Sequence, residues 1–268
     1  MLIQPKIVAV YTTEALILKT KDYGEADRIL TVFTKDRGKI GAIAKGVRRM
    51  ESRKGGNVDQ LNYVLVSLAE GRDLHVVTEV ESLASFHRLK NELNLAVLGY
   101  YVAELIDRFF ADEQVCYSIF RSALMTLSRL DKRSSFLRKI LALRLFELDL
   151  LEELGFNPQF RSCVICGLPI RHEGCVFDAS QGGVICRDCA VGRRGGIAME
   201  LETLRLIRNL QSRAWNDVKR VHCLNAQLNQ VGDSLKYYLE WLLERKFGSL
   251  ELLSDISCLE KINGSVSL

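Results

Sequence analysis

Four cysteines between positions 163 and 189 form two pairs with the same spacing. Cys163 and Cys166 make the first C-x2-C pair, and Cys186 and Cys189 make the second after nineteen intervening residues. Two thiolates three residues apart on a tight turn can reach one ion, and a second such turn completes a tetrahedron. The spacing is typical of four-cysteine zinc sites. We therefore predict one structural Zn2+ bound by these four side chains.

Other interpretations of the cysteine region stay open at this point. His172 and Cys175 lie between the two pairs, and either side chain could replace a ligand. Redox-active C-x-x-C motifs usually begin a helix after a strand, and no strand is expected before Cys163. A site with four protein ligands has no open position, so the metal would stabilise the fold rather than catalyse. The remaining cysteines are expected to be buried thiols: Cys116, Cys223 and Cys258.

The strongest charge feature is a basic run of twenty residues in the N-terminal part. Its eight Lys and Arg residues stand against two acidic ones, Asp36 and Glu51. Lys and Arg contacts to phosphate supply most of the sequence-independent affinity for nucleic acid, so we predict a nucleic-acid surface here. A solvated loop face is the alternative. The predicted contact residues are Lys35, Arg37, Lys39, Lys45, Arg48, Arg49, Arg53 and Lys54.

The motifs of an enzyme are not evident in the sequence. There is no G-x-x-x-x-G-K-[ST] loop, no G-x-G-x-x-G after an expected strand and no G-x-S-x-G elbow. The histidines are scattered, without partners at catalytic spacing. We therefore expect a protein that is not an enzyme and has no catalytic residues. The four histidines are His75, His87, His172 and His222.

The elements that must position these residues change along the chain. Short segments rich in Val, Ile, Leu and Thr, separated by turn residues, predict strands at 7–20, 26–34, 39–46, 60–69 and 73–86. Five short strands with one long basic loop favour a small closed barrel over a sandwich. Phe33 and Tyr63 lie on these strands and are expected in the core rather than as platforms for bases.

After Phe86 the apolar residues recur with a helical period. Helices are predicted at 87–110, 112–130, 134–155, 199–211 and 227–247, with Gly155 and Pro158 ending the third. The 268 residues are 48% hydrophobic and 26% charged, which suits a globular chain of one large or two ordinary domains. No signal peptide and no run of ~18 apolar residues is present, so we expect a soluble cytoplasmic protein without a membrane partner.

Several of these pieces together resemble the RecO family of bacterial recombination mediators. ALILKTKDYGEADRILTVFTKDRGKIGAIAKGVRR contains a strand, D-x-G-E, a strand ending in Thr, a Gly-led hairpin and A-K-G-x-R-R. LRLFELDLLEELGFNPQFRSCVICG looks like the helix that leads into that family's cysteine motif, and GGVICRDC resembles the second half of the motif. The resemblance spans nearly the whole chain.

The resemblance implies a multidomain α+β chain. A five-stranded OB-fold barrel at 1–86 would precede an all-helical domain at 87–268, which carries a zinc module at 160–195. It also implies a DNA repair and recombination function in the RecF pathway, at the nucleoid. Proteins of this family bind single- and double-stranded DNA, anneal complementary strands, and act with RecR to load RecA onto strands coated by single-strand-binding protein. Some members lack part of the cysteine set, whereas both pairs are intact here.

The same resemblance implies a site for the acidic, Phe-ending tail of single-strand-binding protein. Such a tail needs an apolar pocket and nearby cations. The nearest cations to an apolar helical stripe are Arg121, Arg129, Lys132 and Arg133, although for each one alone a solvated residue at a helix end or turn is the favoured interpretation. The alternative function is a zinc-stabilised protein scaffold without direct DNA binding, and salt-dependent DNA binding would distinguish the two.

Overall fold

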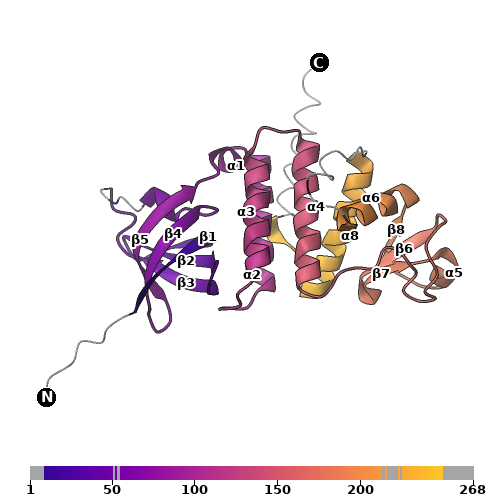
Figure 1. The fold of residues 1–268 in the computed structure, drawn as a ribbon, viewed down its shortest axis with the longest axis horizontal. Helices are drawn as coiled ribbons and strands as arrows, with labels where there is room; N and C mark the ends of the chain where they lie inside the picture. Colours follow the sequence, from indigo (N-terminus) through magenta and orange to yellow (C-terminus); the bar gives the residue numbers. More distant parts are fainter. Residues whose placement is uncertain are drawn as a thin grey trace. The chain divides into compact units, whose positions relative to one another are not determined.

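The chain divides into two compact units. A computed structural model describes residues 9–50, 52, 55–212, 215, 223 and 225–249 (Figure 1). The first unit comprises the described parts of Met1–Asp131 and Gly248–Leu268, and the second is Lys132–Phe247. In the part of the chain that the structure describes, no helix is long and apolar enough to cross a membrane.

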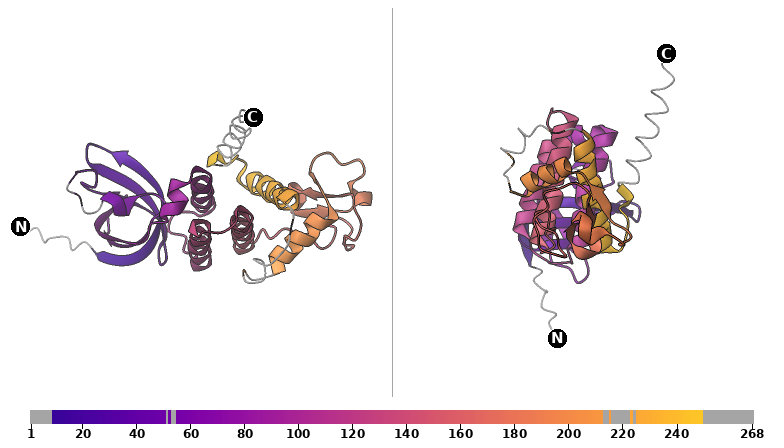
Figure 2. Two further views of the ribbon diagram at one scale, coloured as in Figure 1. Left: turned by 90° about the horizontal axis from the view of Figure 1, so that it is seen from above. Right: turned by 90° about the vertical axis from the view of Figure 1, so that its right-hand side faces the viewer.

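Five strands of the first unit close into a barrel in the order β1-β2-β3-β5-β4 (Figures 1 and 2). Neighbouring strands are antiparallel except β3 and β5, which pair in parallel where Ala42 lies opposite His75. The predicted five-stranded OB-type barrel is confirmed. The strands are β1 (Val10–Tyr23), β2 (Asp27–Thr34), β3 (Gly38–Ala44), β4 (Tyr63–Ala69) and β5 (His75–Ala84), with a short helix η1 (Gly55–Val58) between β3 and β4.

Strand β1 contains four consecutive buried residues because both of its faces are covered. Ala15 and Ile17 belong to the interior cluster of the barrel. Leu16 lies between them and is also fully buried, although it is not part of that cluster. Since successive side chains point to opposite faces of a strand, Leu16 lies on the outer face. Part of the outer face of the barrel is therefore a second packing surface.

Three helices cover this outer surface within the first unit. They are α1 (His87–Asn91), α2 (Leu93–Phe109) and α3 (Tyr117–Asp131), and the left view of Figure 2 looks down the axes of α2 and α3. The ring of Phe33 on β2 packs against Phe110 and Phe120, with centroids 5.4 and 6.2 Å away. Phe33 is thus a core residue, as predicted. The single helix predicted at 87–110 is interrupted at Glu92, which has an extended backbone.

The short helix α1 is fastened both to the barrel and to α3. Lys90 donates from Nζ to Oδ1 of Asn62 at 2.7 Å, and burial lowers the pKa of this lysine. Asp131 at the end of α3 accepts the N–H of Leu89 at 2.8 Å. By packing, the first unit therefore includes α1 to α3 as well as the barrel. The domain boundary predicted between residues 86 and 87 stays a prediction.

In the part of the second unit that the structure describes, three longer helices carry a small β-insert. The helices are α4 (Phe136–Glu153), α6 (Leu201–Ser212) and α8 (Asn225–Leu243). The insert contains β6 (Cys175–Asp178), η2 (Ala179–Gln181), β7 (Gly183–Ile185), α5 (Arg187–Ala190) and β8 (Ile197–Met199). Its strands form an antiparallel sheet in the order β7-β6-β8, which the sequence did not predict. Met199, predicted to begin a helix, instead ends β8.

The β-insert is fixed to the helices by one arginine and a group of aromatic rings. Arg208 of α6 donates from Nε to the carbonyl of Phe160 at 2.7 Å and from Nη2 to that of Ile170 at 3.2 Å. The ring of Phe177 on β6 stacks on Phe160 at 5.2 Å and meets the edge of Tyr238 on α8 at 5.7 Å. These contacts hold the cysteine-bearing segment on a rigid support.

A candidate metal centre and a candidate nucleic-acid interface

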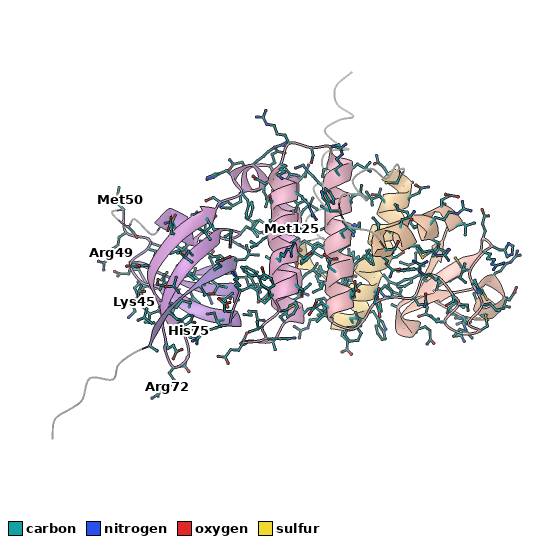
Figure 3. The ribbon with its side chains drawn as sticks, in the orientation of Figure 1. Lys45, Arg49, Met50, Arg72, His75 and Met125 are labelled. Atoms are coloured by element: carbon teal, nitrogen blue, oxygen red, sulfur yellow. The ribbon has the colours of Figure 1, made fainter. Side chains whose placement is uncertain are left out.

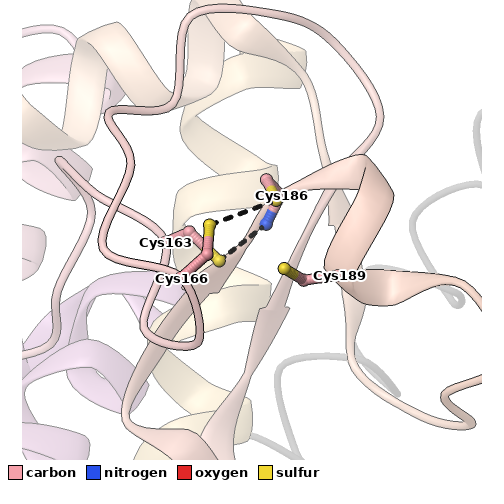
Figure 4. Close-up of side chains that lie close together, drawn as sticks. All are labelled: Cys163, Cys166, Cys186 and Cys189. Carbon is pink, nitrogen blue, oxygen red and sulfur yellow. Dashed lines mark hydrogen bonds between the residues drawn. The ribbon is translucent and has the colours of Figure 1, made fainter.

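The four predicted ligands converge on one point. The Sγ atoms of Cys163, Cys166, Cys186 and Cys189 all lie within 4.8 Å of one another (Figure 4). Cys166 and Cys186 are 3.8 Å apart at sulfur. A tetrahedral zinc with Zn–S bonds of about 2.3 Å has sulfur–sulfur edges of about 3.8 Å, so the residues present fit such an ion.

The local backbone explains how two sequence pairs become one cluster. Cys163 and Cys166 flank a tight turn, closed by a 2.9 Å hydrogen bond from the N–H of Gly167 to the carbonyl of Cys163. Cys186 follows β7 and precedes the first turn of α5, which carries Cys189. Each turn thus brings two sulfurs to the same side, as the C-x2-C spacing predicts.

The electrostatics of the cluster favour a bound cation. Burial raises the pKa of Cys163, but N–H donors of Cys166, Cys186 and Ile165 outweigh it and lower this pKa to about 6. One of these bonds, from the N–H of Cys186 to Sγ of Cys163, measures 3.3 Å. Hydrogen bonds with Cys186 and Cys166 instead raise the pKa of Cys189 to about 12. Four sulfurs this close cannot all become thiolates unless a positive ion offsets their charge.

The two competing ligands lie outside the cluster. Cys175 is buried in β6, where Sγ donates to the carbonyl of Met199 at 3.4 Å and burial raises its pKa. His172 is an exposed loop residue. Of the other cysteines, Cys116 is buried as expected and Cys223 is half-buried, whereas Cys258 lies outside the described residues.

The basic run separates into two groups in the fold. We call Lys35, Arg37 and Lys39, at the β2–β3 turn and on β3, the hairpin cations. We call Lys45, Arg48 and Arg49, which directly follow β3, the loop cations. The two other predicted contact residues, Arg53 and Lys54, lie outside the described residues.

Lys39 is a structural residue. Its ammonium donates to the backbone carbonyl of Asp107 on α2 at 2.7 Å, and the carboxylates of Asp107 and Asp112 lie 3.7 and 3.6 Å away. Its side chain is only 13% exposed. The prediction of a phosphate contact at Lys39 is therefore not favoured, because its charge already fastens β3 to the segment around α2.

The other hairpin cations are also paired with acids. The ammonium of Lys35 lies 3.0 Å from Oε1 of Glu14. The other carboxylate oxygen of Glu14, Oε2, accepts a hydrogen bond from the hydroxyl of the half-buried Tyr63. Burial, followed by this bond, raises the pKa of Tyr63 to about 12. Arg37 lies 2.7 Å from a carboxylate oxygen of Glu70, and its guanidinium stands 3.8 Å from the centroid of the Tyr11 ring.

A groove beside β3 confirms the mixed charge of this region. Three cations line it: Arg37, Lys39 and Arg72. Four acids line it as well: Glu70, Asp73, Asp112 and Glu113. A phosphate entering this groove would meet more negative than positive side chains, so the hairpin cations are poorly placed to bind a nucleic-acid backbone.

The loop cations are more available to a phosphate than the hairpin cations are. Lys45 and Arg49 are exposed, and neither has an ion-pair partner among the described residues (Figure 3). Arg48 lies 3.4 Å from a carboxylate oxygen of Asp22 and donates to the carbonyl of Gly24 at 3.3 Å. Beside them the side chain of Met50 is fully exposed. The candidate nucleic-acid interface therefore lies at this end of the barrel.

Sequence reasoning missed two residues at the same end of the barrel. Lys21 and Tyr23 lie at the end of β1, and both are exposed, Tyr23 by 55%. A signal was present in the sequence, since Lys21 directly precedes the D-x-G-E sequence Asp22–Glu25 and Tyr23 is its second residue. The strand predicted at 7–20 ends before both residues, whereas β1 extends to Tyr23.

The four cations predicted near a partner pocket belong to both units. Arg121 and Arg129 lie on α3 of the first unit. Lys132 and Arg133 belong to the second unit and precede α4. Arg121, Lys132 and Arg133 are exposed.

The fold and the site together define a class of protein. A closed OB-type barrel with an exposed cationic end and a helical unit with a four-cysteine centre are the parts of a multidomain OB-fold protein of nucleic-acid metabolism. Two family models match the chain: Recombination protein O N terminal over residues 8–86, and Recombination protein O C terminal over residues 91–251. The chain therefore belongs to the RecO family.

Similar curated proteins agree with this assignment. DNA repair protein RecO of Roseiflexus sp. (strain RS-1) is 35% identical over 247 residues, 92% of this chain and 86% of the relative. DNA repair protein RecO of Dehalococcoides mccartyi (strain CBDB1) is 30% identical over 246 residues, which are 92% of this chain and 96% of the relative. DNA repair protein RecO of Alkaliphilus metalliredigens (strain QYMF) is 32% identical over 248 residues, which are 91% of this chain and 98% of the relative. The family models meet close to residue 86, whereas the first packing unit extends to residue 131.

Proposed function

We propose that this protein is a non-catalytic mediator of recombinational DNA repair. In this proposal it binds single- and double-stranded DNA, anneals complementary strands, and acts with RecR to load RecA onto strands coated by single-strand-binding protein. It works in the bacterial cytoplasm, at the nucleoid. Membership of the RecO family supports the proposal, and so does the printed name of its relatives, DNA repair protein.

The observation that carries DNA binding is the pair of exposed cations that follow β3. Lys45 and Arg49 are exposed and have no ion-pair partner among the residues that the structure describes. A cation without a carboxylate partner can bind a phosphate and release a counterion from DNA without first breaking an ion pair. Arg48, which shares Asp22 with Arg28, adds a third charge beside them.

The test is a titration of the full chain with labelled single- and double-stranded oligonucleotides at several salt concentrations. If Z phosphates are contacted, log affinity falls with log salt with a slope of about −0.7Z for single strands and −0.9Z for duplex. Absence of binding to both oligonucleotides at low salt would contradict the proposal and favour the alternative, a zinc-stabilised scaffold that joins proteins only.

We also propose that the four cysteines bind one Zn2+ with a structural role. Structural zinc contributes on the order of 10 kcal/mol to local folding, so it would stabilise the β-insert of the second unit. Elemental analysis of the purified protein should give one zinc per chain. Cys186→Ser should lose the metal and destabilise the second unit more than the barrel.

A matched control for the metal site is Cys175→Ala, because Cys175 lies in the same insert but outside the cluster. This variant should keep one zinc per chain. Loss of zinc in Cys175→Ala, or a wild-type protein without zinc whose stability a chelator leaves unchanged, would contradict the assignment of ligands.

The proposed contact with the acidic tail of single-strand-binding protein needs the full chain. A fragment that begins at residue 87 would separate α1 to α3 from the barrel against which they pack. We expect a labelled acidic, Phe-ending peptide to bind with micromolar affinity that weakens with salt. Peptide affinity is then measured for two variants, Arg121→Glu in the first unit and Arg133→Glu in the second. The variant with the weaker affinity identifies the unit that holds the peptide. If the peptide does not bind, the recruitment proposal fails.

A further inference from the structure

The outer face of β1, β2 and β3 carries an exposed aromatic ring at its open end. Lys21 and Tyr23 are two residues apart on β1, so their side chains share one face. Across the sheet, Lys21 pairs with Ile29 and Ile29 pairs with Ile43. Both isoleucines are half-exposed. Lys45 directly follows β3, so this end of the sheet combines an exposed ring, two apolar side chains and two lysines.

The other end of the same face is already covered. Phe33 is four residues after Ile29 on β2 and therefore shares its face, but it is fully buried against the rings of α3 and the preceding loop. Lys19 is two residues before Lys21 and lies 2.5 Å from the carboxylate of Asp107 on α2. Among the residues that the structure describes, the helices thus cover the end with Phe33 and leave the end with Tyr23 open to a ligand.

Two of the acids near this open end, Asp22 and Asp27, are engaged by the protein itself, whereas the exposed Glu25 in the following turn has no ion-pair partner among the described residues. Asp27, which pairs with Tyr23 across β1 and β2, accepts the N–H of Gly46 at 2.8 Å. Asp22 is held by Arg28 at 3.1 Å and by Arg48 at 3.4 Å. Lys21 and Lys45 have no ion-pair partner among the described residues. The charge around the ring therefore complements an anionic ligand with apolar, flat groups.

We infer that Tyr23 is a platform on which an unpaired base of single-stranded nucleic acid stacks, with Lys21 and Lys45 binding the flanking phosphates. Every base has a π-face, so such a contact tolerates any sequence. A duplex keeps its bases stacked on one another, so the ring would gain little from double-stranded DNA. The inference rests on the proposed DNA binding and adds to it a preference for single strands.

The experiment compares Tyr23→Ala and Tyr23→Phe in the full chain, with single-stranded and duplex oligonucleotides at several salt concentrations. Tyr23→Ala should weaken single-strand binding about tenfold, because loss of one base–aromatic stack has an effect of this size. The salt slope should not change, since no cation is lost. Tyr23→Phe should bind as the wild type does, and duplex binding should be unaffected in both. Tyr117→Ala is the control, since Tyr117 is equally exposed at 54% but lies on α3.

A fluorescent base analogue gives a second readout. 2-Aminopurine in the single strand should change its fluorescence on binding wild type and Tyr23→Phe, and not on binding Tyr23→Ala. If Tyr23→Ala binds single strands as tightly as wild type, or if Tyr23→Phe loses as much as Tyr23→Ala, the stacking inference is wrong while DNA binding stands. If the wild type binds neither DNA, the proposed function and the inference both fail.

Discussion

The hairpin cations and the loop cations are neighbours in sequence but meet different surroundings in the fold. Each hairpin cation lies within 3.7 Å of a carboxylate, contributed by Glu14, Glu70 or the pair Asp107 and Asp112. Among the described residues the loop cations have one such partner, Asp22, at Arg48. A count of charges along the sequence therefore gives the number of cations in this region but not how many are available to a ligand.

The difference matters for binding more than for stability. The exposed Arg37–Glu70 pair and the half-exposed Lys35–Glu14 pair contribute little to folding, and they can open. A phosphate that displaced either carboxylate would still lie close to it, and the repulsion would offset part of the gain. We therefore expect the loop cations to supply most of the phosphate contacts.

The largest effect should come from reversing the loop cations. The triple variant Lys45→Glu, Arg48→Glu and Arg49→Glu replaces three attractions to phosphate by three repulsions. We expect roughly a 100-fold loss of affinity for single strands near physiological salt, alike for all sequences. Binding is measured by anisotropy, and thermal unfolding serves to show that the variant is folded. Wild-type affinity in a folded triple variant would place the interface elsewhere.

A smaller effect, on stability rather than binding, is expected at Lys39. Lys39→Met removes the hydrogen bond to the Asp107 carbonyl and takes this cation away from the carboxylate of Asp112, while the carboxylate of Asp107 keeps Lys19 at 2.5 Å. The free energy of unfolding should fall by about 1–3 kcal/mol in urea denaturation. The control, Lys45→Met, should change it by less than about 0.5 kcal/mol, because Lys45 is exposed and unpaired among the described residues. If Lys39→Met and Lys45→Met have the same free energy of unfolding, the contrast between the hairpin cations and the loop cations is wrong.

The smallest effect should come from releasing a hairpin cation. Glu70→Gln removes the carboxylate that lies 2.7 Å from Arg37. Affinity for single strands should rise two- to threefold, and the salt slope should steepen by at most about 0.7, the contribution of one added phosphate contact. Glu173→Gln, an exposed acid in the cysteine segment, is the charge-matched control and should have no effect. The same small rise in both variants would indicate a general effect of net charge.

The sequence was sufficient to predict the barrel and the convergence of the four cysteines. Turn residues delimit all five strands, and the C-x2-C spacing itself restricts where two sulfurs can lie. The three-stranded sheet of the insert was not predicted, because strands of three or four residues are too short to show a period of two. The break at Glu92 was missed because no Gly or Pro marks it.

The division of the basic run could not be predicted either. The partners of the hairpin cations come from β1, from the end of β4 and from α2, so they approach only when the barrel closes and the helices pack on it. Likewise, the exposure of Tyr23 and the burial of Phe33 depend on which part of the outer face the helices cover. These properties are long-range, whereas the patterns in the sequence are local.

The most direct test compares two matched neutral variants in one titration series. The loop pair is Lys45→Gln with Arg49→Gln, and the hairpin pair is Lys35→Gln with Arg37→Gln. Each pair removes the same formal charge, and the quantity measured is the slope of log affinity against log salt for a single strand. We predict that the slope shrinks by about 1.4 in the loop pair, since two phosphate contacts are lost, and stays unchanged in the hairpin pair. An equal reduction in both pairs, or a reduction in the hairpin pair alone, would contradict the account.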